Sequence, residues 1–298
     1  MDVREGTVAF DEAETWYRVT GDLQPGDAAE PAPLVVLHGG PGAAHDYLLS
    51  LADLADRRAV IHYDQLGCGR SAHYPERGAE FWTPELFVRE LHNLVDALGI
   101  ADRHHVLGQS WGGFLAEEYA LTQPPGLRAL VLADTAASWA DFATEANKLR
   151  AELPEDVQAT LEKHEAAGSY DDPEYMEACL VFYSRHVCRI PWPPEVAATF
   201  EWLERDPTVY RTMNGPSEFH IIGSCKDWQV KDRLHEIRVP TLLVSGRYDE
   251  ATPALQQVLV DGIAGSEWVC FEESSHLPHV EERERYMQVV GDWLAQYD

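Results

Sequence analysis

The sequence predicts an α/β protein with a mostly parallel, doubly wound sheet and an inserted helical cap. Short apolar runs alternate with amphipathic helical segments from residue 1 to 135, and the alternation resumes from 238 to 298. Residues 136–237 interrupt it with acidic, aromatic-rich helical segments and a proline cluster. Glycine-bearing turns directly follow several apolar runs, as at the carboxyl ends of parallel strands. We therefore expect a core made of 1–135 and 238–298, with a helical cap over 136–237.

The elements before the insertion follow in order along the chain. Residues 6–10 and 15–20 indicate an opening β-hairpin. Residues 34–37 form a continuous apolar run, typical of a buried parallel strand, and end in the glycine-rich turn 38–42. The next expected elements are a helix over 44–55, a strand over 59–64 with the glycine-bearing loop 65–71, a helix over 84–98 capped by Thr83, and a strand over 127–133.

Four further elements are expected after the insertion. They are a strand over 241–245, a helix over 253–263 capped by Thr252, a strand over 267–271 and a helix over 280–297. Each strand is followed by a polar loop, so side chains that could take part in catalysis again lie at the carboxyl edge of the sheet.

Composition excludes several classes of function. The 298-residue chain has a formal net charge of −28, which argues against nucleic acid and anionic membranes as partners and would attract a cationic substrate. No run of eighteen apolar residues occurs, and residues 1–6 lack a signal-peptide pattern, so we expect a cytoplasmic protein. The five cysteines contain no C-x-x-C pair, so neither a disulfide framework nor a zinc site is expected.

The pattern Gly108-x-Ser110-x-Gly112 lies between an apolar strand signal and a segment of good helix formers. This is the strand–turn–helix arrangement of a nucleophile elbow, where glycines are needed because the turn is too sharp for neighbouring side chains. The strained turn would lift the Ser110 hydroxyl above the sheet, near the positive end of the next helix. Ser110 is therefore the predicted nucleophile.

An acid and a base follow later strands in a compatible order. Asp249 comes after the predicted strand 241–245, and His276 comes after 267–271. The order Ser, Asp, His is that of α/β-hydrolase triads. His276 would take the serine proton, and Asp249 would hold the imidazole in the useful tautomer. His279 is the competing base, although His276 comes first after the strand.

Acyl transfer also requires an oxyanion hole. The backbone N–H of Trp111, directly after the nucleophile, is one expected donor. The second should come from the turn 38–42, where missing side chains allow a substrate carbonyl to approach. Gly40 is the preferred donor, and Gly39 is the alternative.

These segments and several cap motifs resemble the proline iminopeptidases, which are serine aminopeptidases of the α/β-hydrolase fold. The cap motifs are most similar to the branch that contains the tricorn-interacting aminopeptidase, and the resemblance covers nearly the whole chain. It admits relatives that are amino-acid amidases. The matching segments are 38–42, 64–71, 108–113, 168–170, 173–175, 192–196 and 213–219.

The resemblance implies roles for further residues. Glu218, in the cap, and Glu250, directly after the triad aspartate, match two glutamates that hold the substrate's free amine. Carboxylates near the nucleophile would suit an exopeptidase, because the cationic amine lies only two bonds from the attacked carbonyl. Tyr210 matches a tyrosine near the reacting centre. Trp111 replaces a tyrosine that is common in this branch, which changes the expected pocket shape but not the backbone donor.

We therefore expect a serine aminopeptidase or amidase that releases N-terminal proline or an apolar residue from short peptides or amino-acid amides, without a metal or cofactor. The main alternative is a related hydrolase of an ester, lactone or non-peptide amide without a free amine. Dehalogenases and epoxide hydrolases fit less well, because they normally have aspartate where Ser110 stands. A catalytically silent binding protein would not need a complete set of catalytic residues.

Overall fold

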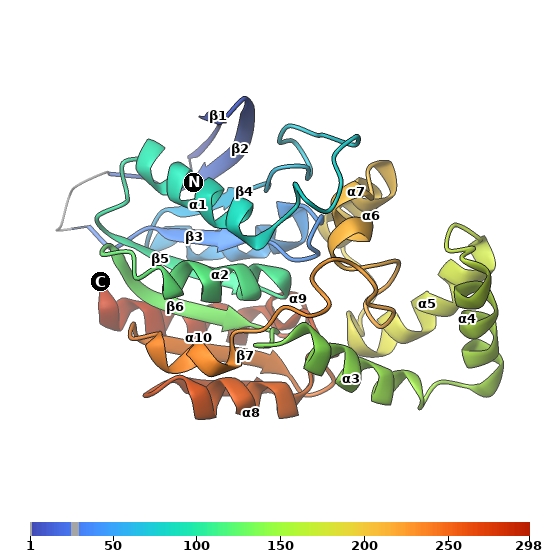
Figure 1. Cartoon of the computed structure of the whole chain (residues 1–298). Helices are drawn as coiled ribbons and strands as arrows, with labels where there is room; N and C mark the ends of the chain where they lie inside the picture. The colour runs from blue at the N-terminus through green and yellow to red at the C-terminus, as the bar shows by residue number, and fades with distance from the viewer. Residues whose placement is uncertain (1, 25–29) are drawn as a thin grey trace.

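The structure, a computed structural model, describes residues 2–24 and 30–298. The described residues form an eight-stranded sheet in the order β1-β2-β4-β3-β5-β6-β7-β8, with helices on both faces (Figure 1). The β1–β2 hairpin and the β2–β4 pair are antiparallel, and every later pairing is parallel. The predicted fold class is thus confirmed.

All the strands predicted from the sequence are present. The central ones are short and fully buried, because helices cover both faces of a parallel sheet. The strands are β1 Val3–Phe10, β2 Ala13–Thr20, β3 Leu34–Leu37, β4 Val60–Tyr63, β5 His104–Gln109, β6 Leu127–Ala133, β7 Thr241–Gly246 and β8 Glu267–Phe271.

The sheet separates the buried hydrophobic side chains into two clusters, one between each of its faces and the helices that cover it. Successive residues of β3 alternate between them: Val35 and Leu37 belong to one cluster, Leu34 and Val36 to the other. Helices α1, α2 and α8 contribute to the first cluster, and η1 and α10 to the second. These helices are η1 His45–Asp56, α1 Pro84–Ala97, α2 Trp111–Leu121, α8 Pro253–Gly262 and α10 Arg283–Leu294.

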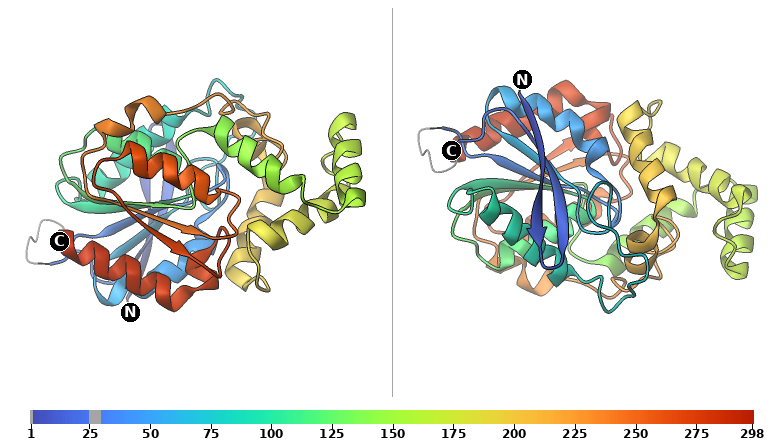
Figure 2. Two further views of the ribbon diagram at one scale, coloured as in Figure 1. Left: turned by 90° about the horizontal axis from the view of Figure 1, so that it is seen from below. Right: turned by 90° about the horizontal axis from the view of Figure 1, so that it is seen from above.

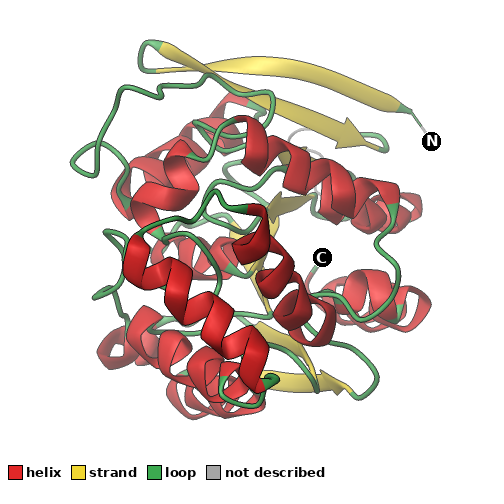
Figure 3. Cartoon of the chain, turned by 90° about the vertical axis from the view of Figure 1, so that its right-hand side faces the viewer, coloured by secondary structure: helices red, strands yellow, loops and turns green. Residues whose placement is uncertain are grey.

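Most of the segment 136–237 extends from one end of the sheet, and β3 and β6 point toward it (Figures 1 and 2). Viewed from that side, these helices lie in front of the sheet (Figure 3). The segment contains α3 Trp139–Arg150, α4 Glu155–Ala167, α5 Pro173–His186, α6 Pro194–Arg205, α7 Thr208–Met213 and η2 Lys231–Glu236. The last of these, η2, packs against α2 and α8.

Three details of the predicted helices are wrong. The helix predicted over 44–55 is a 3₁₀ helix, η1, which runs over His45–Asp56. The final helix is interrupted at Glu282 (φ −123°, ψ 46°), which separates α9 Pro278–Glu281 from α10, and the chain then passes into η3 Ala295–Tyr297. The Glu282 carboxylate accepts hydrogen bonds from the preceding loop, including one from Ser274 Oγ at 2.7 Å. The helix is therefore interrupted at the residue whose side chain binds the loop that contains Ser274.

The two predicted helix caps differ in outcome. Thr83 Oγ1 accepts a hydrogen bond from Leu86 N at 3.3 Å, so Thr83 caps α1 as predicted. Thr252 stands at the N-cap of α8 but makes no side-chain cap; its hydroxyl donates to Glu145 Oε2 at 3.0 Å instead. Glu145 belongs to α3, which packs against α8, so a tertiary contact replaces the local one.

Helix α2 contains a buried acid that the sequence did not single out. Glu117 is 0% exposed, and neither carboxylate oxygen has a hydrogen-bond partner among the described residues. Burial, with a smaller contribution from the charge of Glu118, raises the pKa of Glu117 well above its usual value. The folded protein therefore keeps this carboxyl neutral at a pH where the unfolded chain ionises it, so the destabilisation grows as pH rises above about 4.3.

Replacing Glu117 with methionine is expected to stabilise the protein by about 1–3 kcal/mol near neutral pH, because a buried polar group without partners is removed. Thermal unfolding at pH 6 and pH 8 measures this, and the gain should be at least as large at pH 8. Glu118→Met is the matched control: Glu118 accepts a hydrogen bond from Trp228 Nε1 at 2.8 Å, so its loss should bring no gain. A lower melting temperature for Glu117→Met would contradict this account.

Candidate active site

Ser110 lies at a sharp turn between β5 and α2. Its backbone has φ 57° and ψ −124°, a conformation that non-glycine residues rarely adopt. A Cβ on Gly108 would lie 2.0 Å from Gly112 O, and one on Gly112 would lie 2.1 Å from Leu37 O. Side chains at either position would therefore collide with backbone. Both glycines of the predicted elbow are sterically required.

Asp249 and His276 meet at the carboxyl edge of the sheet, after β7 and β8. His276 Nδ1 and Asp249 Oδ1 are 2.6 Å apart, and the carboxylate identifies Nδ1 as the hydrogen-bond donor. This tautomer leaves Nε2 free to accept a proton. Burial alone would lower the pKa of His276, but the charge and hydrogen bond of Asp249 outweigh it and raise the pKa above its usual value. Ser110 and His276 line the same cavity.

The competing histidine is held elsewhere. His279 is fully buried, its Nε2 donates to Tyr47 O at 3.1 Å, and burial lowers its pKa to about 3. It is absent from the cavity lining within the described chain, whereas His276 is present there. This arrangement favours His276 as the base and gives His279 the position of a packing residue.

A hydrogen-bond chain that the sequence analysis missed joins the elbow to the loop of His276. Gly39 N donates to Tyr47 Oη at 2.7 Å, and Tyr47 Oη donates to Gln109 Oε1 at 2.5 Å. Gln109 Nε2 then donates to His276 O at 2.9 Å. Gln109 stands inside the elbow motif, which was an available signal. Tyr47 lies on η1 and carried no such signal.

The same chain distinguishes between the two predicted oxyanion donors. The Gly39 N–H is engaged by Tyr47, so Gly40 is better placed to donate to a substrate. Gly40 has φ 112°, and a Cβ there would lie 2.5 Å from Gly42 N. The turn also approaches the nucleophile, since a Cβ on Gly39 would lie 3.0 Å from Ser110 Cβ. Trp111 N is at the first position of α2, where an N–H has no intrahelical acceptor.

The side chain of Trp111 points into the protein core. It is 1% exposed, and its Nε1 donates to Gln65 Oε1 at 2.8 Å. Gln65 in turn contacts His38 twice, through its backbone N–H to Nε2 and through its side-chain amide to His38 O. The replacement of tyrosine by Trp111 therefore does not place an indole in the cavity lining of the described chain. The indole instead contacts Gln65, whose hydrogen bonds to His38 hold the start of the glycine-rich turn.

Two carboxylates face the cavity that contains Ser110. Glu218 Oε1 accepts a hydrogen bond from Tyr210 Oη at 2.5 Å, and Glu250 Oε1 is 3.7 Å from His276 Nε2. Glu250 is 1% exposed, and its Oε2 has no hydrogen-bond partner among the described residues. Burial raises the pKa of both carboxyls, and the charges of Glu218 and Asp249 raise that of Glu250 further.

The cavity has a volume of about 360 Å³. Ser110, His276, Glu218 and Glu250 all line it. Much of the remaining lining comes from apolar side chains of α5, α6 and the segment between them, including Met176, Val187, Val196, Phe200 and Leu203. Ser110, His276, Glu218 and Glu250 are thus brought to one cavity, and Asp249 is joined to it through its hydrogen bond with His276.

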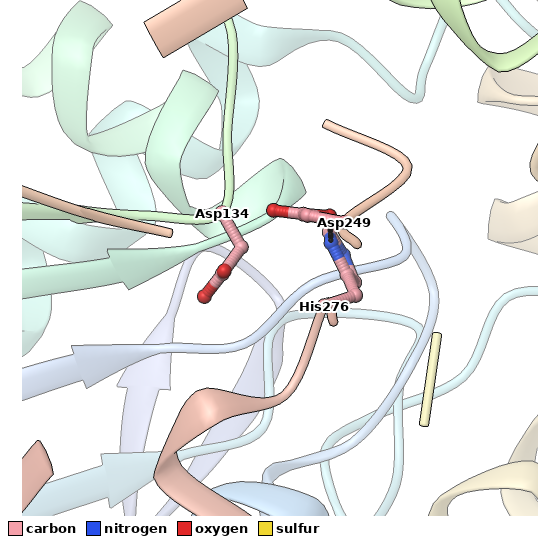
Figure 4. A group of neighbouring side chains, drawn as sticks. All are labelled: Asp134, Asp249 and His276. Carbon is pink, nitrogen blue, oxygen red and sulfur yellow. Dashed lines mark hydrogen bonds and ion pairs between the residues drawn. The ribbon is translucent and has the colours of Figure 1, made fainter. Parts of the chain in front are cut away.

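Two groups of side chains in the described chain have a spacing that could hold a metal ion. One is Asp134, Asp249 and His276 (Figure 4). In this group His276 Nδ1 already donates a hydrogen bond to Asp249. The other is His164, Asp172 and Glu174. Lys163 Nζ lies 2.5 Å from Glu174 Oε2, so an ammonium already pairs with this second group. The expectation that no metal is needed stays a prediction.

Comparison with known proteins defines the class. The sequence profile of the alpha/beta hydrolase fold matches residues 32–283. The crystal structure of VinJ superimposes with a TM-score of 0.96 at 51% identity, covering 99% of both chains. A proline iminopeptidase from Mycobacterium smegmatis gives a TM-score of 0.89 at 47% identity, covering 99% of this chain and 98% of that one.

The relatives by sequence narrow the class further. Proline iminopeptidase from Lactobacillus helveticus (strain DPC 4571) is 38% identical over an alignment of 304 positions that covers 100% of both chains. The chain therefore belongs to the proline iminopeptidase family of α/β hydrolases. No helix of the described residues combines the length and the apolar character required to cross a bilayer.

Proposed function

We propose that this protein is a serine aminopeptidase that releases N-terminal proline or an apolar residue from short peptides or amino-acid amides. The observation that carries the proposal is the pair of carboxylates, half-buried Glu218 and buried Glu250, in the cavity of Ser110 and His276. Family membership supports it, because curated relatives are proline iminopeptidases. The cavity offers both a nucleophile and a place for a cationic amine.

The reaction would proceed through an acyl-enzyme. Ser110 Oγ attacks the substrate carbonyl carbon while His276 Nε2 takes the hydroxyl proton, and Asp249 stabilises the imidazolium. The N–H groups of Gly40 and Trp111 hold the negative charge that develops on the carbonyl oxygen. The C–N bond then breaks, and His276 gives its proton to the leaving amine. Water, deprotonated by His276, hydrolyses the ester and frees the amino acid and Ser110.

Amine recognition follows from the electrostatics of the carboxylates. Burial raises the pKa values of both Glu218 and Glu250, and the negative charges of Glu218 and Asp249 raise that of Glu250 further. An ammonium group supplies the positive charge and the donors that favour the ionised forms, including a donor for Glu250 Oε2. An N-acylated substrate offers no such charge and would leave the carboxylates unpaired. Tyr210 holds Glu218 in place through its hydroxyl.

We also propose a role for the helical segment, a location in the cell and a second type of substrate. We assign residues 136–237 the role of a cap, since their side chains form much of the cavity wall above Ser110. The five free cysteines fit a reducing cytoplasm. Hydrolysis of amino-acid amides would use the same amine contacts as peptide hydrolysis, because both substrates present a free N-terminus.

The sharpest test deletes one negative charge at a time. Glu218→Gln and Glu250→Gln each keep the side-chain shape but weaken a charge-assisted contact worth about 1.5–3 kcal/mol. Each variant should therefore lose about ten- to a hundredfold in kcat/KM on proline amide or alanine amide. Hydrolysis of p-nitrophenyl acetate, which has no ammonium, should hardly change. Initial rates on both substrate types, beside the N-acetylated amides, measure the difference.

The pattern of losses separates the possible readings. An equal loss on amide and ester would indicate damage to the catalytic residues, a particular risk for Glu250, which adjoins Asp249. Unchanged activity on the free-amine substrates at both positions would rule out the aminopeptidase proposal. In that case a hydrolase of esters, lactones or blocked amides would be the better description.

A further inference from the structure

A further buried acid, Asp134, lies beside Asp249 and His276. Asp134 directly follows β6, the strand beside β7, and is 0% exposed with a backbone φ of 51°. Its Oδ1 accepts a hydrogen bond from Gly246 N, at the end of β7, at 3.2 Å. Figure 4 shows Asp134 beside the Asp249–His276 pair. The mechanism above gives this residue no role.

The two aspartates are close, and each has one carboxyl oxygen without a partner. One oxygen of Asp134, one of Asp249 and a ring nitrogen of His276 all lie within 4.8 Å of one another. Oδ2 of Asp249 and Oδ2 of Asp134 are both buried without a hydrogen-bond partner among the described residues. Two ionised carboxylates in this arrangement would repel each other and leave both oxygens uncompensated. One proton placed on the pair removes both problems.

We propose that Asp134 is a positioning residue for the triad: it stays a neutral carboxylic acid and donates a hydrogen bond from its Oδ2 to Oδ2 of Asp249. This inference rests on the catalytic roles proposed for Ser110, Asp249 and His276. No proton is transferred in this arrangement. The proton stays on Asp134, and Asp249 stays ionised to hold His276 Nδ1–H.

The surroundings of Asp134 favour the neutral form. Burial is the largest cause that raises the pKa of Asp134, followed by the charge and hydrogen bond of Asp249. Glu281 adds a further negative charge, and the Gly246 N–H opposes the shift. The titratable groups that face it from the packed elements are Asp249, His276, Glu281, Tyr47 and Tyr286. Of these, His276 alone can become positive, and its Nδ1 is bonded to Asp249.

The functional consequence is orientation of the catalytic acid. Asp249 Oδ1 receives two donors, His276 Nδ1 and Ala251 N, whereas Oδ2 would receive only the proton of Asp134. A carboxylate held at both oxygens cannot rotate away from the imidazole. Hydrogen-bond partners of metal-ligating residues commonly affect activity by about ten- to a hundredfold, and we expect a similar effect for the partner of a catalytic carboxylate.

Two variants test the donor. Asp134→Asn keeps a donor for Asp249 and an acceptor for Gly246 N, while Asp134→Leu keeps neither. We expect Asp134→Leu to lose about ten- to a hundredfold in kcat with little change in KM, and Asp134→Asn to recover most of that loss. The alkaline decline of kcat that arises when Asp134 ionises should be absent from Asp134→Asn. Circular dichroism reports whether each variant folds.

Infrared spectroscopy tests the protonation directly and without catalysis. The spectrum of the parent minus that of Asp134→Asn, at neutral pH, should contain the carbonyl band of a protonated carboxylic acid. Absence of that band, or an Asp134→Asn variant as impaired as Asp134→Leu, would overturn the proposal. If Asp134→Leu fails to fold, the infrared difference and the pH profile of Asp134→Asn still decide. Failure of the triad itself would be recognised separately, by activity that survives Ser110→Ala.

Discussion

Ser110→Ala is expected to lower kcat by about three or more orders of magnitude while the protein remains folded, because a nucleophile and its base act as a unit. Alanine retains the Cβ of serine, so the strained backbone of the elbow is no harder to form. Turnover of a proline amide measures the loss, and a fluorophosphonate probe should label the parent protein but not the variant.

Ser50→Ala is the matched control for this experiment. Ser50 is also buried, its hydroxyl has no hydrogen-bond partner among the described residues, and it does not line the cavity. It should keep full turnover and full labelling. A purified Ser110→Ala protein that retained most of its activity would show that the nucleophile has been misassigned.

His276→Ala should abolish turnover to a similar extent, since no other group of the proposed triad can take the Ser110 proton. His279→Ala should cost far less, through the loss of its contact with Tyr47 and of packing. Steady-state kinetics and thermal unfolding of both variants compare the two. The reversed outcome, with His279→Ala inactive and His276→Ala active, would mean that the wrong histidine has been chosen.

The pH profile adds an independent readout for the same residue. Catalysis needs neutral His276, and its pKa is raised because the charge and hydrogen bond of Asp249, with the charges of Glu218 and Glu281, together outweigh the effect of burial. The acidic limb of kcat/KM should therefore lie above the ordinary histidine value of about 6.5. Activity should rise as the pH increases through this limb. His279, whose pKa is lowered to about 3, would instead place the limb at a much lower pH.

Much of the fold could be predicted because its signals are local. The run Leu34–Leu37 is apolar at every position and ends in a glycine-rich turn, a pattern typical of a strand buried on both faces. The elbow could also be predicted from the sequence. A side chain at Gly108 or Gly112 would collide with backbone within a few residues of Ser110 or at the end of the adjacent strand. Helix details were less predictable: the break at Glu282 accompanies side-chain contacts with another loop.

The sequence by itself determined the class of fold, the elbow serine, and the order in which an acid and a base follow later strands. Each of these depends on residues that are neighbours in the chain or on the common edge at which parallel strands end. The tertiary structure decided what distant residues do to one another. It engages the Gly39 N–H with Tyr47, holds His279 away from the cavity lining, and places Asp134 behind Asp249. Such choices depend on distances across the fold and on burial, because hydrogen bonds and pKa values respond to neighbours in space whatever their separation in sequence.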